Sequence, residues 1–448
     1  MVADTVYFCA SCGHESAKWL GQCPGCGEWN SFREQPSAPR RRSRNPRRGG
    51  EPVPVTEAAA TTTARVLTGM EGLDRVLGGG LVPGSLVLVA GEPGVGKSTL
   101  LLQMAAALAE SRRPALYVSA EESAAQVAMR AERLGVLDPD LLLLAETTCE
   151  AVEGRIEELS PSLVVVDSVQ TMEVEDADGV AGSVGQVRQV AARFQHLAKT
   201  RDVPVVLVGH VTKEGVIAGP KLLEHLVDVV MALDGEPGHD LRVLRAAKNR
   251  FGTVAEMALF AMGEQGLEPV RNPSAWLLED RQAEAAGSVV AAVLQGQAPL
   301  LVEVQALVAP SPLATPRRVT QGFDASRLAL LLAVLERRSN LRFADKEVFV
   351  NLAGGLVVRE PALDVAVAAA LVSSALDRPL PADLAVFGEV GLLGEVRAVS
   401  RAAERVREAR ALGFARVALP ARSASSELEL PSLPVAAVAD LVTLLAKE

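Results

Sequence analysis

The chain has 448 residues, a formal net charge of −10 and a hydrophobic fraction of 49%. This composition is typical of a folded globular protein with about two or three domains and excludes wholesale disorder. No apolar run reaches the roughly 18 uncharged residues of a membrane span, and the first residues lack the features of a secretory signal, so we expect a cytoplasmic protein without a membrane partner. The acidic total does not favour nucleic acid, but such binding requires only a local basic surface.

The N-terminal residues 1–34 contain four of the five cysteines, as two Cys-x-x-Cys pairs that are each followed by glycine. Such turns direct two thiolates toward one metal, and two turns supply the tetrahedral four-sulfur set that zinc prefers. A cytosolic location disfavours disulfides, and His14 is not needed as a ligand because four cysteines complete the shell. Cys149, far along the chain, is expected to be a packed thiol. The spacing predicts a structural C4 zinc finger with the ligands Cys9, Cys12, Cys23 and Cys26.

Residues 35–64 are rich in Pro, Arg, Thr, Ala and Glu and lack hydrophobic periodicity, which predicts a flexible linker. Six arginines lie between Arg40 and Arg48. They suit a solubilising segment or a basic contact to nucleic acid, and the sequence leaves both interpretations open.

Residues 65–270 alternate apolar strand-like runs with helical patterns, which predicts a parallel α/β sheet. A helix is expected at Lys97–Glu110, and a crossover helix is expected between residues 187 and 198, where apolar residues recur at helical spacing. The expected strands are Ser85–Ala90, Ala115–Ser119, Leu163–Asp167 and Val205–Gly209.

A phosphate-binding loop is predicted between the first of these strands and the following helix, because GEPGVGKST at 91–99 matches G-x-x-x-x-G-K-[ST] in that context. Its glycines allow backbone N–H groups to surround a phosphate at the helix N-terminus. Lys97 is expected to reach the β- and γ-phosphates of ATP, and Ser98 is expected to coordinate Mg²⁺. The predicted nucleotide-binding residues are Gly91, Glu92, Pro93, Gly94, Val95, Gly96, Lys97, Ser98 and Thr99.

Polar side chains follow three of the other strands. Asp167 ends its strand and is expected to hold the Mg²⁺ shell. Glu121 and Glu122 follow the strand after the phosphate-loop helix, where a carboxylate can orient or deprotonate the attacking water. We favour Glu121, although adjacent glutamates leave the choice open. His210 and Lys213 are candidates for sensing the γ-phosphate.

Residues 271–286 are expected to be a second linker, and residues 287–448 a second α/β domain. Two strand-like runs, Ser288–Leu294 and Leu300–Val308, surround a Gly-Gln-Ala-Pro turn. The elements expected to follow are a helix at Ser326–Arg337, a strand at Glu347–Leu352 and helices at Leu363–Leu376, Arg401–Leu412 and Ala437–Lys447.

Two further motifs are DSVQT at 167–171 and KNRFG at 248–252. With the cysteine pairs and the phosphate loop, in this order, they resemble the RadA (Sms) family over essentially the whole chain. The resemblance implies a RecA-type P-loop ATPase core with ATP, Mg²⁺ and Zn²⁺ as cofactors. It also implies a homo-hexameric ring whose ATP hydrolysis is stimulated by single-stranded DNA, and which promotes strand exchange and branch migration on branched DNA with a RecA-type recombinase.

Lys248 and Arg250, in the KNRFG motif, are the remaining catalytic candidates. They follow a strand-like segment, Leu241–Ala246, and can contact nucleotide or DNA, or reach a neighbouring subunit's γ-phosphate as an arginine finger does. Without the resemblance, a solvated turn held by Gly252 is the favoured interpretation.

The C-terminal domain resembles the proteolytic domain of Lon proteases. Residues 387–396 look like a strand region of that family, and residues 360–364 fall where it carries its serine nucleophile. This segment contains no serine, and Ala402 and Ala403 occupy the neighbourhood of the catalytic lysine. A Ser–Lys dyad needs both groups, so we expect a proteolytically inactive, Lon-protease-like α/β domain.

Three functions are compatible with these patterns. A DNA-dependent ATPase that processes recombination intermediates in DNA repair is favoured. An ATP-dependent protease is opposed by the missing serine and lysine. A RecA-like signalling ATPase that phosphorylates itself is opposed by the zinc module and the KNRFG motif.

Overall fold

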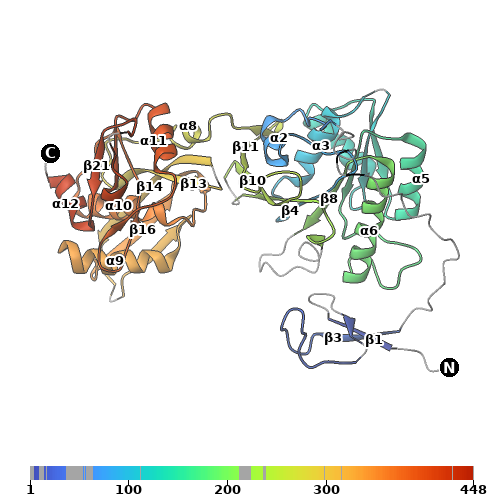
Figure 1. Cartoon of the computed structure of the whole chain (residues 1–448), viewed down its shortest axis with the longest axis horizontal. Helices are drawn as coiled ribbons and strands as arrows, with labels where there is room; N and C mark the ends of the chain where they lie inside the picture. The colour runs from blue at the N-terminus through green and yellow to red at the C-terminus, as the bar shows by residue number, and fades with distance from the viewer. Residues whose placement is uncertain are drawn as a thin grey trace. The chain divides into compact units, whose positions relative to one another are not determined.

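The computed structural model describes residues 5–9, 15–16, 18–36, 54, 56, 64–110, 112–210, 223–235, 239–296, 298–313, 315–425 and 427–446. The chain divides into two compact units, residues 1–234 with 242–269 and residues 235–241 with 270–448 (Figure 1). Among the helices of the described residues, none is both long and apolar enough to cross a membrane.

The N-terminal module is a small antiparallel sheet in the order β2-β1-β3. Its strands are β1 (Thr5–Cys9), β2 (Glu15–Ser16) and β3 (Phe32–Pro36). The buried side chains of the module are Cys9, Cys23 and Phe32, and Tyr7 and Leu20 pack against them. Folds with cores this small usually require a metal or cross-links for stability.

The large sheet of the first unit has nine strands among the described residues, in the order β12-β11-β10-β9-β4-β8-β7-β5-β6. The strands are β4 (Leu86–Gly91), β5 (Ala115–Ser119), β6 (Leu141–Ala145), β7 (Leu163–Asp167), β8 (Val205–His210), β9 (Val229–Asp234), β10 (Leu241–Asn249), β11 (Met257–Gly263) and β12 (Gly266–Pro269). The helices are α2 (Glu71–Leu77), α3 (Lys97–Ala107), α4 (Ala124–Arg133), α5 (Cys149–Leu159) and α6 (Val184–Arg201). The predicted strands β5 and β7 are confirmed with the same bounds.

The central strands are buried on both faces, as their continuous Val and Leu runs predict. Successive side chains of a strand point to opposite faces. Val87 and Val89 therefore pack in one core with side chains of α2, α3 and α4, while Leu86 and Leu88 pack in another with α5 and α6 (Figure 1).

Parallel pairing brings the ends of four strands to one edge of this sheet. β4 pairs with β8, β8 with β7 and β7 with β5, all parallel. The residues that follow these strands therefore meet at one edge, where open α/β sheets bind ligands.

Residues 229–269 differ from the expected alternation of strands and helices. They form four successive strands, of which β9 and β10 pair antiparallel, as do β11 and β12. Antiparallel neighbours need only short turns and no crossover helix, which explains the difference.

The second unit contains a seven-stranded sheet in the order β15-β16-β14-β13-β17-β20-β21, formed by described residues. Its strands are β13 (Ser288–Gln295), β14 (Ala298–Pro310), β15 (Arg318–Gln321), β16 (Lys346–Leu352), β17 (Leu384–Val386), β20 (Arg416–Pro420) and β21 (Ser432–Val435), with a separate hairpin of β18 (Glu389–Val390) and β19 (Val396–Arg397). The helical segments are α8 (Pro273–Leu277), α9 (Ala325–Ser339), η1 (Ala353–Gly355), η2 (Pro361–Leu363), α10 (Asp364–Leu376), α11 (Ala402–Ala411), η3 (Ala421–Ser423) and α12 (Val438–Ala446).

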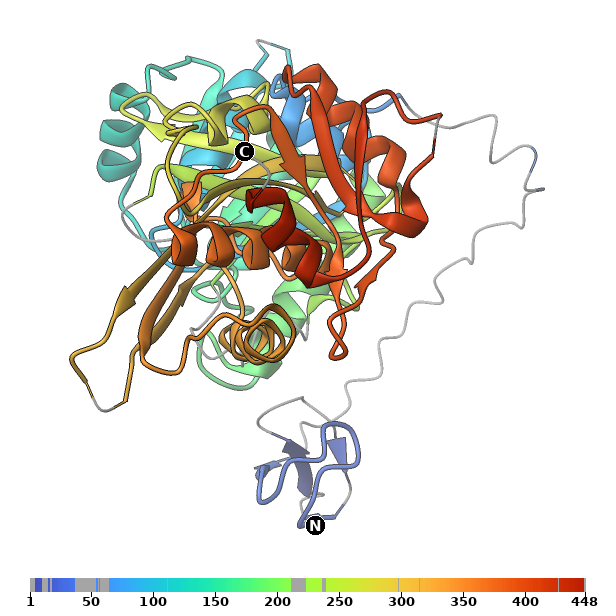
Figure 2. The same ribbon diagram turned by 90° about the vertical axis from the view of Figure 1, so that its left-hand side faces the viewer.

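Helix α10 is the central helix of this unit. It is buried along nearly its whole length against β13 and β14, and α9 and α12 pack against it. The connection between β14 and β15, gold to orange in Figure 2, extends away from the body of the unit.

The segment 271–286, expected to be a linker, contains α8. Asn272 caps this helix by accepting a hydrogen bond from Ala275 N at 3.0 Å. Ser274 is buried, and its hydroxyl donates to Glu408 (2.6 Å) and accepts from Leu301 N (3.0 Å). A five-residue helix is too short to produce a periodic pattern in the sequence, so periodicity did not predict it.

Candidate nucleotide-binding site and cysteine module

The phosphate loop lies between the central strand β4 and helix α3, as predicted. Gly94 and Gly96 have left-handed φ values of 78° and 110°, which favour glycine. A Cβ atom on Gly96 would lie 2.6 Å from Met262 Cε, and one on Gly91 would collide with the Leu233 carbonyl oxygen. Glycine is therefore favoured at 94 and 96 by the turn and required at 91 by the close approach of the β9 backbone.

Lys97 is the first residue of α3, and only 3% of it is exposed. Its Nζ atom donates to the carbonyl oxygens of Gly91 (2.8 Å) and Glu92 (2.9 Å) and lies 3.2 Å from His210 Nδ1. Burial lowers the pKa of Lys97, while the charges of Asp167 and Glu121 act in the opposite direction. A cation held inside the loop in this way is placed to meet a phosphate that enters it.

Asp167, at the end of β7, is 8% exposed and faces the same edge of the sheet. The hydroxyl of Tyr117 on the neighbouring strand β5 donates to Asp167 Oδ2 at 2.6 Å. Burial, followed by the Asp167 charge, raises the pKa of Tyr117 well above its ordinary value, so Tyr117 remains a donor. This hydrogen bond holds a buried carboxylate at the sheet edge, and carboxylate oxygens are ligands that suit a Mg²⁺ shell.

The two adjacent glutamates after β5 have different partners. Glu121 Oε1 accepts a hydrogen bond from the Ser168 hydroxyl and lies 3.3 Å from His210 Nε2. Glu122 turns away to an ion pair of 2.7 Å with Arg130 on α4. Of the two glutamates, Glu121 is therefore the one that lies beside His210, whose other ring nitrogen is close to Lys97.

Two polar atoms at this edge are buried without hydrogen-bond partners among the described residues: His210 Nε2 and Gln170 Oε1. The His210 atom is close to Glu121 but lacks hydrogen-bond geometry toward it. Buried polar groups are normally satisfied. A phosphate seated at the loop is a fitting acceptor for a His210 Nε2–H group, and a water there is a fitting donor to Gln170 Oε1.

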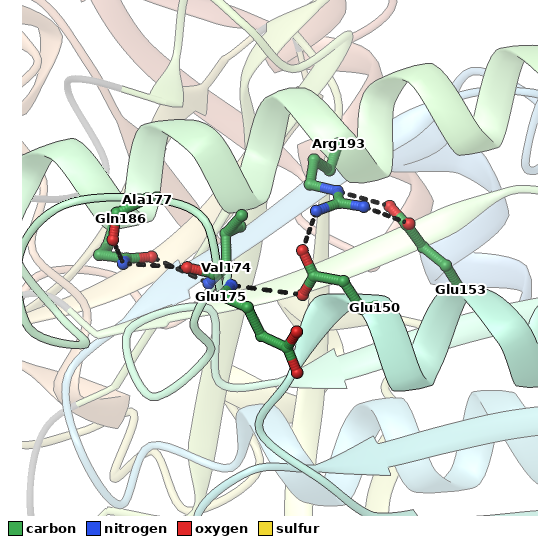
Figure 3. Close-up of polar contacts among 7 residues, drawn as sticks. All are labelled: Glu150, Glu153, Val174, Glu175, Ala177, Gln186 and Arg193. Carbon is green, nitrogen blue, oxygen red and sulfur yellow. Dashed lines mark hydrogen bonds and ion pairs between the residues drawn. The ribbon is translucent and has the colours of Figure 1, made fainter. Parts of the chain in front are cut away.

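The loop that follows Asp167 is held in place by α6 (Figure 3). The buried Gln186 side chain accepts from Val174 N (2.9 Å) and donates to Ala177 O (2.8 Å). Arg193, further along the same helix, pairs with Glu150 and with Glu153 (2.6 Å) on α5. This bracing fixes the loop whose first residue, Ser168, binds Glu121.

A cavity of about 670 Å³ lies beside the phosphate loop, under the turn between β11 and β12. It is lined by Thr99, Arg133, Leu134, Met262, Gly263, Glu264, Gln265 and Gly266. Thr99 joins this cavity to the phosphate loop.

Three of the four predicted metal ligands converge in the N-terminal module. The Sγ atoms of Cys9, Cys23 and Cys26 lie within 4.8 Å of one another, and those of Cys9 and Cys26 are 3.6 Å apart. Tetrahedral zinc with Zn–S bonds of about 2.3 Å separates its sulfurs by about 3.8 Å, so these residues fit the metal. Cys12 lies outside the described residues, as do His14, Lys213 and Arg40–Arg48.

The cations of the KNRFG motif have partners within the same unit. Lys248 Nζ donates to the carbonyl oxygens of Glu224 and Val227 (2.8 Å), and burial followed by the charge of Arg250 lowers its pKa. Arg250 forms a 3.0 Å ion pair with the buried Asp228. The second oxygen of Asp228 accepts from Leu86 N at the start of β4, so the motif braces the strand that leads to the phosphate loop.

In the C-terminal unit, residues 360–364 are engaged in buried ion pairs. Asp364, 1% exposed, pairs with Arg327 (Nε to Oδ1, 2.9 Å) and accepts from Val390 N (3.0 Å). Glu360 pairs with Arg405, a fully buried side chain that also donates to Ala292 O at 2.7 Å. The segment that the resemblance to Lon proteases predicts to hold a nucleophile therefore carries two ion-paired carboxylates in this chain.

Tyr117 and Ser168 are site residues that the sequence prediction missed. Tyr117 is the one side chain with a polar end inside the apolar run ALYV, which was a usable signal. Ser168 directly follows Asp167, and only the folded loop reveals that its hydroxyl binds Glu121.

Comparisons with known proteins cover most of the chain. A family model described as an AAA domain matches residues 52–216, a rubredoxin metal binding domain matches 7–34, and subunit ChlI of Mg-chelatase matches 326–423. The chain is 49% identical over 421 residues to the DNA repair protein RadA of Halalkalibacterium halodurans, covering 93% of this chain and 92% of that one. It is 47% identical over 442 residues to the protein of that name from Bacillus subtilis, with coverages of 97% and 96%. It is 48% identical over 423 residues to the one from Haemophilus influenzae, with coverages of 93% and 92%.

About half of the residues along nearly the full length are thus shared with these relatives, and the chain carries an α/β RecA-like core, an N-terminal cysteine module and a Lon- and ChlI-like C-terminal region. The chain belongs to the RadA family.

Proposed function

We propose that this chain is a DNA-stimulated ATPase that processes recombination intermediates in the cytoplasm, promoting branch migration as a homo-hexameric ring on single-stranded DNA together with a RecA-type recombinase. The observation that carries the proposal is the meeting of Lys97, Glu121 and Asp167 at the edge of the sheet beside the phosphate loop. The relatives' name, DNA repair protein, supports DNA as what the ATPase acts on.

Each residue has a separate task in this proposal. The loop Gly91–Thr99 holds the phosphates of ATP, and Lys97 balances the charge on the β- and γ-phosphates. Ser98 coordinates Mg²⁺, and Asp167 holds its shell. Glu121 orients the attacking water, because Glu122 is bound to Arg130.

The test of this function is the ATPase rate with and without single-stranded DNA at several salt concentrations. We expect stimulation that weakens as salt rises, because DNA binding releases counterions. An ATPase rate that DNA leaves unchanged at low salt contradicts the proposal. A casein digestion assay tests the alternative function of an ATP-dependent protease. The ion-paired Asp364 and Glu360 disfavour that alternative.

We expect the cysteine module to carry about one zinc per chain. Cys9→Ala or Cys26→Ala should lose the metal, because each removes one of the converging thiolates. Cys149→Ala is the matched control and should retain zinc, since Cys149 is buried on α5 in the other part of this unit. Elemental analysis of freshly purified protein measures this. Zinc-free wild type, or equal zinc in Cys26→Ala, contradicts the assignment.

Lys248→Ala is expected to leave ATP hydrolysis intact while impairing DNA binding and branch migration. The variant loses the bonds to Glu224 O and Val227 O, which anchor the residues before β9, while the phosphate loop keeps its own contacts. Since we expect Lys248 to contact a DNA phosphate as well, basal ATPase should persist while single-stranded DNA affinity and branch migration fall and the salt dependence of DNA binding becomes shallower.

Arg250→Ala is instead expected to reduce ATP hydrolysis itself. The Arg250 side chain is about half exposed, so it can leave Asp228 and serve a neighbouring subunit's γ-phosphate. We expect hydrolysis to fall far more than ATP binding. Arg245→Ala is the control, because Arg245 lies on β10, the strand that ends just before Arg250, in an exposed pair with Asp234. If ATPase, DNA binding and branch migration all match wild type in both Lys248→Ala and Arg250→Ala, the motif is only a structural turn.

A further inference from the structure

A cation from a distant strand reaches the phosphate loop. Arg242 lies at the start of β10, and its Nε atom donates to the carbonyl oxygen of Val95 at 3.0 Å. The two residues are 147 positions apart in the sequence. Lys97 donates to the carbonyl oxygens of Gly91 and Glu92 in the same loop. One cation inside the loop and one outside it therefore hold three of its carbonyl groups.

The directions of the strands account for the contact made by Arg242. β9 runs parallel to β4, and β10 runs antiparallel to β9, so the start of β10 lies at the same edge of the sheet as the end of β4. Side chains alternate along a strand, so Arg242 shares a face with Leu244 and Ala246, which pack in the core with α3. Arg242 is therefore directed to the face of the sheet on which the phosphate loop leads into α3.

The hydrogen bond to Val95 fixes the orientation of one peptide group of the loop. The Val95 side chain is buried, and its N–H donates to the Glu92 carbonyl oxygen at 3.3 Å. The next residue is Gly96, with a φ of 110°, and a glycine allows the peptide before it to rotate at little cost. A trans peptide directs its C=O and its N–H to opposite sides. By holding the Val95 oxygen, Arg242 therefore also sets the direction of the Gly96 N–H.

The Gly96 N–H belongs to the part of the loop that receives phosphate. Gly96 is the N-cap of α3, and a helix leaves its first four N–H groups without partners inside the helix. These groups are the donors that a phosphate loop offers to an anion. With the peptide turned over, the Val95 carbonyl oxygen would replace one of these donors and repel the phosphates. An arginine that holds this oxygen favours the anion-binding orientation, and its positive charge adds to the attraction.

We propose that Arg242 is a positioning residue of the ATPase, which holds the Val95–Gly96 peptide with its N–H toward the phosphates of the nucleotide. The inference rests on the proposed nucleotide site and adds to it a residue that lies outside the phosphate-loop motif. Because Arg242 acts through the loop, it contributes to nucleotide affinity, while the hydrolytic step depends on Lys97 and Glu121.

The test compares Arg242→Ala, Arg242→Gln and Arg242→Lys with wild type in the full-length chain. Arg242→Ala should raise the Kd for ADP and the KM for ATP about tenfold, the usual effect of losing one hydrogen bond from a charged group. Its kcat at saturating ATP should stay within about threefold of wild type, because the substitution removes a contribution to binding. Arg242→Lys keeps a cationic donor and should recover most of the affinity, and Arg242→Gln, with a neutral donor, should lie between the two. Calorimetric titration measures the Kd, and phosphate release measures the KM and kcat.

Arg245→Ala is the matched control, because Arg245 lies on the same strand, alternates to its other face and is paired with Asp234. Its Kd, KM and thermal unfolding midpoint should match those of wild type. An unchanged Kd for ADP in Arg242→Ala, or a lower kcat with unchanged KM and Kd, overturns the inference and leaves the nucleotide site standing. Equal losses of affinity in all three Arg242 variants, each with a lower unfolding midpoint, show that Arg242 only stabilises the fold, and they overturn it as well. A wild type that neither binds ADP nor hydrolyses ATP contradicts the proposed function itself.

Discussion

ATP turnover by Lys97→Ala should fall below detection while the protein remains folded. The substitution removes the cation whose Nζ atom donates to the Gly91 and Glu92 carbonyl oxygens, where the phosphates of ATP would recruit it. Stabilisation of developing charge makes the greatest contribution to catalysis in most phosphoryl transfers. Phosphate release at saturating ATP measures the effect.

Folding should survive this change. Burial lowers the pKa of Lys97 and outweighs the favourable charges of Asp167 and Glu121, so truncation removes a desolvated charge and two hydrogen bonds that lie within the loop itself. Lys199→Ala is the matched control, because Lys199 is exposed on α6 away from the phosphate loop. Turnover of Lys97→Ala within threefold of wild type would falsify the assignment of the site.

Glu121→Gln should lower ATP turnover by about 10²–10⁴-fold, the usual contribution of a general base. The amide keeps the size of the side chain and can still bind the Ser168 hydroxyl, but it neither accepts a proton nor attracts the water's hydrogens as strongly. ATP affinity should change little, because Glu121 lies on the far side of His210 from Lys97.

The adjacent glutamate supplies the control for this experiment. Glu122→Gln breaks an ion pair with Arg130 that is partly exposed, and such pairs contribute about 1 kcal/mol or less. Its turnover should stay close to that of wild type. Equal losses in the two variants, measured as single-turnover rates, would show that the choice of Glu121 is wrong.

Many strands of the first unit and its phosphate loop could be predicted, because they depend on residues that are neighbours in the sequence. Apolar runs such as LVVVD end where a polar residue reaches the sheet edge, so β5 and β7 were predicted with the same bounds that the structure has. The phosphate loop is likewise set by glycines within one turn. Local patterns of this kind need no knowledge of the rest of the fold.

The partners of the site residues depend on contacts that are distant in sequence. Glu121 and Glu122 are neighbours of the same type, and only the position of Arg130 on α4 separates them. Lys248 binds carbonyl oxygens more than 20 residues away, which no spacing rule indicates. The sequence also does not reveal that Gln186 holds the loop after Asp167, because a buried glutamine cannot be distinguished from an exposed one in the sequence.

The ion pairs of the C-terminal unit also limit which substitutions its fold tolerates. A serine placed at position 364 would leave Arg327 without its counter-charge, and breaking a largely buried pair is costly. Replacing Glu360 would in the same way strand the fully buried Arg405. Each of the two pairs therefore constrains its neighbour in sequence, because Glu360 or Asp364 can be replaced only if the buried or partly buried arginine beside it is replaced as well.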